Sequence, residues 1–101
     1  MIRGTTPTHT FNIPFDTSAI TALRIIYSQG DEQILVKELP DCTVDGNTIS
    51  VKLTQEDTFK FDCHKNTVQI QLRVLTAGND ALASDPVSVP VFKCLDSEVL
   101  V

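Results

Sequence analysis

Hydrophobic and polar residues alternate along much of this chain, most regularly between Thr67 and Thr76. Residues of one parity are apolar there and those of the other parity are polar: Val68, Ile70, Leu72 and Val74 against Gln69, Gln71 and Arg73. Successive side chains of a β-strand point to opposite faces, so the segment is predicted to be a strand with one buried and one solvent-exposed face. A helix would not gather these apolar side chains into one stripe.

The same alternation, in shorter pieces separated by turn-forming residues, predicts six further strands. They run from His9 to Phe15, Ile20 to Ser28, Gln33 to Leu39, Cys42 to Val44, Thr48 to Leu53 and Ala81 to Phe92. Between Val44 and Thr48 a two-residue hairpin turn is expected, because glycine accepts the positive φ that such turns need. The sequence leaves open whether the turn is Asp45-Gly46 or Gly46-Asn47.

One short helical turn is predicted at Thr54–Asp57, just before the longest strand. A threonine followed two and three residues later by acids is typical of a capped helix start. The aromatic and aliphatic residues expected in the core are Phe11, Ile13 and Phe15 of the first strand and Phe59 and Phe61, which follow the helical turn.

The last predicted strand carries Pro86 and Pro90, four residues apart. Because proline has no N–H, both missing donors fall on the same lateral side, and Val87 and Val89 keep their amides for the other side. This pattern predicts an edge strand that pairs with Thr67–Thr76 and lacks amide donors for a further strand on its outer side.

These elements together predict a seven-stranded, antiparallel β-sandwich of the immunoglobulin-like type, in which turns recur about every eight to twelve residues. A single closed barrel is the alternative architecture. A chain of 101 residues fits one domain, residues 1–101, with an extended N-terminal arm (residues 1–8) and a C-terminal tail (residues 94–101).

The charge balance is acidic, with 8 basic and 13 acidic side chains and a net charge of −5. Nucleic-acid binding draws much of its affinity from clustered Lys and Arg, whereas the basic residues here are scattered singly. We therefore expect no nucleic-acid partner. Apolar runs such as Ile34-Leu35-Val36 are too short to cross a bilayer, so no membrane partner is expected either.

The start of the chain lacks the apolar stretch of an export signal, so folding in a reducing cytoplasm with free thiols is expected. No motif of a nucleophilic enzyme or of a phosphate-binding loop is present. His9 lies on an apolar strand face, where histidine is usually a packing residue. We therefore predict no enzyme and no cofactor.

A zinc site of the Cys₃His type could in principle use all the cysteines and one histidine: Cys42, Cys63, His64 and Cys94. Structural zinc sites usually take two ligands from one C-x-x-C turn, and the chain has none. The thiols are therefore predicted to be packing residues, and no metal is expected.

Both ends of the chain are candidates for contacts with other proteins, because an apolar terminus either packs across its own sheet or docks on a neighbouring subunit. Packing on its own domain is the commoner case. The candidate interaction residues are Ile2, Arg3, Leu95, Val99, Leu100 and Val101.

Several stretches carry a family resemblance that covers nearly the whole chain: R-G-T-T-P-T-H-T-F-N-I-P-F-D (Arg3 to Asp16), L-T-Q-E-D-T-F-K-F (Leu53 to Phe61), V-Q-I-Q-L-R-V (Val68 to Val74), A-S-D (Ala83 to Asp85) and C-L-D-S-E-V-L (Cys94 to Leu100). They resemble small proteins encoded by phages and prophages of Gram-positive gut bacteria. More distantly, the start is similar to the N-terminal β-sandwich of phage baseplate upper proteins, a noncatalytic assembly platform. This chain departs from those proteins in having no coiled stalk or receptor-binding region.

The resemblance implies a noncatalytic virion structural protein of the tail, baseplate or capsid. Its partners would be virion proteins or copies of itself, and it would fold in the host cytoplasm before entering the virion. The alternative is a cytoplasmic binding module, encoded by a mobile element, that inhibits or regulates a host protein. A small-molecule site between the sheets is a third option, although no convergent polar set indicates it.

Overall fold

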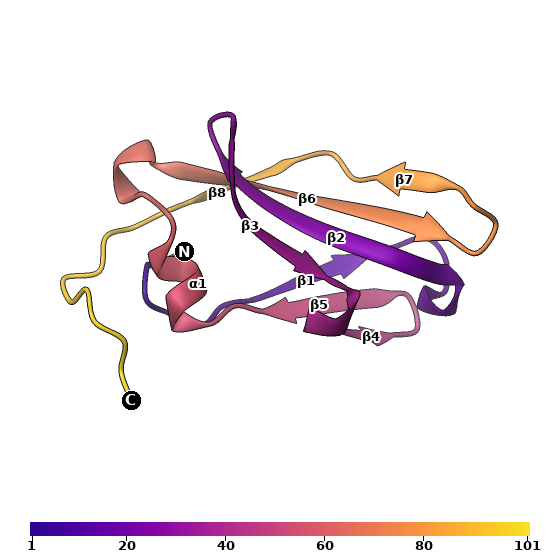
Figure 1. Ribbon diagram of the computed structural model, residues 1–101, viewed down its shortest axis with the longest axis horizontal. Coiled ribbons are helices and arrows are strands. Elements are labelled where there is room, and N and C mark those ends of the chain that lie inside the picture. The colour runs from indigo at the N-terminus through magenta and orange to yellow at the C-terminus, as the bar shows by residue number, and fades with distance from the viewer.

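The computed structural model describes all residues from 1 to 101 and places the strands in two antiparallel sheets that pack face to face (Figure 1). The smaller sheet has the order β1-β5-β4, with β1 at Thr8–Asn12, β5 at Thr48–Lys52 and β4 at Cys42–Asp45. The larger sheet has the order β3-β2-β6, with β3 at Glu32–Glu38, β2 at Ile20–Gln29 and β6 at Thr67–Thr76. Two short strands, β7 at Ala81–Ala83 and β8 at Val87–Pro90, follow one another along the free side of β6.

The chain passes back and forth between the two sheets, but β2 and β3 lie in the same sheet, whereas the second and third strands of an immunoglobulin domain lie in different sheets. It starts in the smaller sheet with β1, forms the hairpin of β2 and β3 in the larger one, returns for the hairpin of β4 and β5, and ends with β6, β7 and β8 in the larger sheet. The predicted all-β sandwich is therefore confirmed. The barrel alternative is wrong, because the two sheets stay separate.

The turn between β4 and β5 is Gly46-Asn47, which settles the register that the sequence left open. Asp45 pairs with Thr48 across the hairpin, so the two residues between them form the turn. Gly46 has a φ of +58°, a conformation that costs a residue with a Cβ but not glycine.

The predicted last strand is interrupted, which is why the structure has eight strands rather than seven. Arg73 pairs with Ala83 and Ile70 with Val87, so three steps along β6 correspond to four along the partner chain. Ser84 is the site of this irregularity: its hydroxyl accepts a hydrogen bond from the Leu72 amide at 3.0 Å, in place of a backbone carbonyl. The irregularity bends the strand without releasing it from β6.

The position of β8 at a sheet edge is confirmed. The Val91 amide donates to the Asn66 carbonyl at 2.7 Å, and Val91 has the same parity as Val87 and Val89. These amides therefore face β6, and Pro90 faces outward, as predicted; Pro86 lies just before β8.

The connection from β5 to β6 contains the single α-helix, α1 (Gln55–Phe59), and the other helical pieces are 3-10 turns at Thr17–Ala19, Leu39–Asp41 and Cys63–Lys65. The Thr54 hydroxyl accepts from the Asp57 amide at 3.1 Å, and the Asp57 carboxylate accepts from the Thr54 amide at 3.0 Å. The predicted capped turn is thus present. With five residues, α1 is far too short to cross a membrane, and no other helix is long enough.

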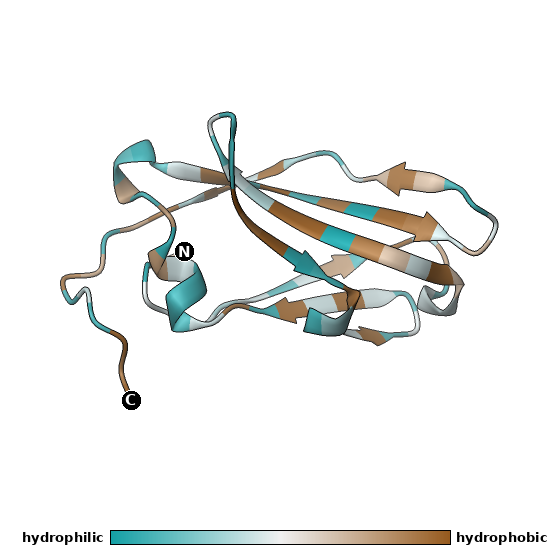
Figure 2. Ribbon diagram, viewed as in Figure 1, coloured by the Kyte–Doolittle hydropathy of each residue, from teal (hydrophilic) through white to brown (hydrophobic).

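The core lies between the two sheets and is lined by alternate residues of the longer strands. Figure 2 shows the hydrophobic and hydrophilic bands that alternate along β2 and β6. Tyr27 is fully buried at its centre, with its ring 5.8 Å from that of Phe61. Ile13 is buried, and Phe11 and Phe15 pack half-buried against the core. The expectation that Phe59 points into the core is wrong: α1 continues through this residue, so strand alternation does not apply to it.

Candidate interaction site

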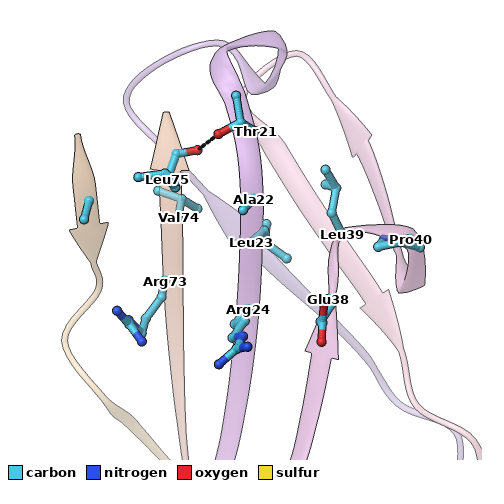
Figure 3. Close-up of a pocket in the computed structure, with 11 residues that line it drawn as sticks. Thr21, Ala22, Leu23, Arg24, Glu38, Leu39, Pro40, Arg73, Val74 and Leu75 are labelled. Carbon is cyan, nitrogen blue, oxygen red and sulfur yellow. Dashed lines mark hydrogen bonds between the residues drawn. The ribbon is translucent and has the colours of Figure 1, made fainter. Parts of the chain in front are cut away.

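The outer face of the larger sheet carries a row of charged side chains. The strand β2 directs Leu23 and Ile25 into the core, so its residues of opposite parity, including Arg24, face solvent. Arg24 is directly opposite Arg73 on β6 and Glu38 on β3. Figure 3 shows these three side chains on neighbouring strands.

The row borders an open hollow of about 630 Å³, named here the Arg24/Arg73 hollow. Its wall is formed by small or apolar residues: Ala22, Leu39, Pro40, Leu75 and Ala81. At its end the register of β2 against β6 slips, and the Thr21 hydroxyl donates to the Leu75 carbonyl at 3.1 Å (Figure 3). The hollow therefore combines two guanidinium groups with an apolar wall.

The two arginines have no ion-pair partner in the chain, although Glu38 is directly opposite Arg24. The ion pairs of the structure are Lys37 with Asp57 and Lys65 with Glu32. Like charges directly opposite on a sheet are unfavourable by up to about 1 kcal/mol, so this pair is not explained by stability. Two adjacent guanidinium groups are suited to bind carboxylates through paired N–H donors.

A second group of charges lies in the interior and holds α1 against the larger sheet. The Lys37 ammonium is 2.8 Å from the Asp57 carboxylate, and only 17% and 9% of their side chains are exposed. Burial alone would raise the pKa of Asp57, but the hydrogen bonds from Lys37 and from the Thr54 amide outweigh it and lower that pKa. This ion pair is structural, because the two charged groups pair with each other inside the fold and are not available to a ligand.

His9 and Tyr27 form an interior hydrogen bond of 2.7 Å between the imidazole Nδ1 and the phenol oxygen. Burial raises the pKa of Tyr27 and lowers the pKa of His9, so both groups are held neutral near pH 7. Tyr27 is fully buried, which keeps its hydroxyl away from any substrate. The pair therefore joins the two sheets across the core.

The possible zinc ligands of the sequence are not brought together as a set of four. One group of neighbouring ligand atoms exists, in which Asp62, Cys63 and His64 lie within 4.8 Å of one another. Cys42 and Cys94 do not belong to it, and all three cysteines are free thiols. Burial raises the pKa of Cys42, which makes that thiol a weak nucleophile.

The N-terminal arm lies against its own domain. Arg3 is half-buried over the Phe59 ring, with 5.6 Å from its guanidinium carbon to the ring centroid, and its Nη2 donates to the Phe59 carbonyl at 2.9 Å. Ile2 forms a parallel bridge with Phe92, yet 48% of it remains exposed. Of these two predicted interaction residues, Ile2 is therefore the accessible one.

The C-terminal tail runs away from the sheets past α1 and ends in apolar residues (Figures 1 and 2). Leu95 is 97% exposed and Leu100 is 75% exposed, while Val99 is half-buried. The Gln55 side chain donates to the Leu100 carbonyl at 3.0 Å and accepts from its amide at 2.8 Å. Val101, the last of the predicted interaction residues, is fully exposed.

Sequence reasoning missed the Arg24/Arg73 hollow because its two arginines are 49 positions apart in the chain (73 − 24). Each could be assigned to the outer face of its strand, but their opposition depends on the register of β2 against β6. Comparison of the chain with family models, with curated proteins and with solved structures gives no match. The fold assignment therefore rests on strand order and register alone.

Proposed function

We propose that this protein is a noncatalytic structural component of a phage or prophage virion, in the tail, baseplate or capsid, and that it acts by binding other proteins. The virion assignment rests on the sequence resemblance described above. The mode of action rests on one structural observation: an apolar tail that its own domain leaves uncovered.

The exposure of Leu95 and Leu100 carries the argument. Burying a leucine side chain that was exposed contributes about 1.5–3 kcal/mol, so a partner that covers both gains a substantial part of a binding free energy. The tail is fixed to α1 by the amide of Gln55 and not by apolar packing of these leucines. Such a segment is suited to bind a neighbouring protein.

Mass spectrometry of purified particles tests the proposal. Particles induced from a lysogen that encodes this chain are purified by density gradient, and we expect the protein among the virion peptides in constant ratio to a known structural protein. An abundant host cytoplasmic protein serves as the contamination control. If the chain is present in the lysate but no more enriched in particles than this control, the virion assignment is wrong and the host-directed binding module takes its place.

A further inference from the structure

The Arg24/Arg73 hollow and the C-terminal tail have complementary charge. The hollow presents two guanidinium groups and one carboxylate, that of Glu38 opposite Arg24, and neither arginine forms an ion pair in the chain. The tail carries Asp96 and Glu98, both exposed and neither in an ion pair, and the Asp96 carboxylate accepts only the Glu98 amide, at 3.0 Å, in a local turn that a partner would open. In a protein with a net charge of −5, this cationic pair is a local exception that an acidic segment would neutralise.

The spacing within the acidic pair is also similar to the spacing within the arginine pair. In an extended tail, Asp96 and Glu98 would point to the same side about 7 Å apart, because alternate residues of a strand share a face. Opposite residues on neighbouring strands, such as Arg24 and Arg73, have their Cα atoms about 5 Å apart. On the same side of such a tail, Leu100 would follow the two acids and meet apolar wall residues such as Leu75.

The tail cannot fill the hollow of its own chain. Figure 1 shows the tail leaving the sandwich at the end where α1 lies, whereas Ala22 and Leu75 place the hollow near the other end, where β2 begins and β6 finishes. The longest dimension of the molecule is 46 Å. An acidic tail that occupies the hollow must therefore come from another molecule.

We propose that the Arg24/Arg73 hollow binds the C-terminal tail of a second copy of this chain. This inference rests on the proposed function, because it names the partner and both surfaces of the assembly. Asp96 and Glu98 bind the two arginines, and Leu100 covers the apolar wall. Since hollow and tail are different surfaces, the contact is head-to-tail and extends into a ring or a filament.

Two neutral variants test this arrangement. The hollow variant is Arg24→Gln with Arg73→Gln, and the tail variant is Asp96→Asn with Glu98→Gln. Sedimentation velocity over a range of concentrations should show wild-type oligomers that weaken as salt is raised. Each variant alone should self-associate at least about tenfold more weakly. Mixed in equal amounts, they should form a 1:1 complex that grows no further, because the mixture has one intact hollow for each intact tail.

A conservative variant separates charge from fold. Arg24→Lys with Arg73→Lys keeps both cations and should retain most of the association, and urea unfolding of every variant confirms that it is folded. A monomeric wild type, or a hollow variant that associates as the wild type does, overturns the inference. If the hollow variant associates normally while the tail variant does not, the tail binds elsewhere. Presence in particles is measured separately, so the proposed function can survive either result.

Discussion

Both ends of this chain are predicted from the sequence to be candidates for contacts with other proteins, and the structure treats them differently. The N-terminal arm is tied to its domain by backbone pairing: Met1 donates to the Pro90 carbonyl at 2.6 Å, the Phe92 amide donates to Met1, and the Arg3 amide donates to Phe92. The C-terminal tail is tied through a single side chain, Gln55. The N-terminal arm is therefore part of the fold, because its backbone pairs with the chain just after β8. The tail pairs with no strand and remains accessible to a partner.

Both ends of the chain contact the helix α1. The buried Thr58 hydroxyl donates to the Thr5 carbonyl at 2.8 Å and accepts from the Gly4 amide at 2.9 Å, while Gln55 on the same helix holds Leu100. The arm thus uses the buried side of α1 and the tail an accessible one. Disturbing the helix should therefore break the buried hydrogen bonds that hold the arm.

Removal of the ion pair beneath α1 should have the largest effect. Lys37→Met leaves the Asp57 charge buried without its cation, and we expect the free energy of unfolding to fall by about 3 kcal/mol. The measurement is urea unfolding, with hydrogen exchange of the Gly4 amide as a report on the arm.

The matched control is Lys65→Met, because Lys65 is 3.8 Å from Glu32 in an exposed pair. Its effect should stay within about 0.5 kcal/mol. Equal losses in the two variants would mean that the Lys37 pair does not anchor the helix.

The next largest loss of stability is expected from a substitution in the arm itself. Gly4 has a φ of +82°, and a Cβ there would lie 2.5 Å from the Phe59 Cζ atom. Gly4→Ala should therefore cost about 2 kcal/mol in urea unfolding, through both the backbone conformation and the displaced ring.

Gly30→Ala is its control, since Gly30 has a similar φ of +61° with no atom within 4 Å of the new Cβ. This variant isolates the backbone cost of about 1 kcal/mol. If both alanines cost the same, the contact between the arm and Phe59 contributes nothing.

Lowering the pH should weaken the ion pair that holds α1, the helix on which the N-terminal arm packs. The pKa of Asp57 is lower in the folded chain than its ordinary value of 3.8, so the unfolded chain takes up the proton first as the pH falls. Its stabilising contribution is complete above pH 3.8 and is lost as the pH falls through the folded pKa. Urea midpoints measured between about pH 6 and pH 3 should decline less in Asp57→Asn than in the wild type. A hydrogen bond from the Ser18 amide lowers the pKa of Asp16, which supplies some of the remaining slope.

Local features of the fold were predictable from the sequence. The burial of Ile70 and Leu72 follows from a period of two, and the capping by Thr54 and Asp57 follows from a four-residue motif. Both signals are complete within a few neighbouring residues. For the same reason the outward orientation of Pro90 in β8 could be assigned before the position of the strand was known.

Features set by register or by distant neighbours were not predictable. The opposition of Arg24 and Arg73 arises when β2 and β6 pair, and no local pattern specifies that pairing. Arg3 would be expected from the sequence to be an exposed cation, and it is half-buried because the arm packs against Phe59. The split of the last strand depends on the hydroxyl of Ser84, which replaces a carbonyl as acceptor.

Truncation after Asp96 should have the smallest effect on stability and a clear effect on association. It removes the Gln55–Leu100 hydrogen bonds and no buried apolar side chain, so the free energy of unfolding should change by no more than about 0.5 kcal/mol. Light scattering should nevertheless show weaker association, because Leu100 and Val101 are lost.

Gln55→Ala gives the control for this truncation, since it removes the same hydrogen bonds and keeps the tail. We expect it to leave stability unchanged and association intact, because a released tail remains available to a partner. A truncated chain that loses more than about 2 kcal/mol would place the tail within the fold. A chain that is monomeric by light scattering both with and without residues 97–101 would show that the tail does not dock on other copies.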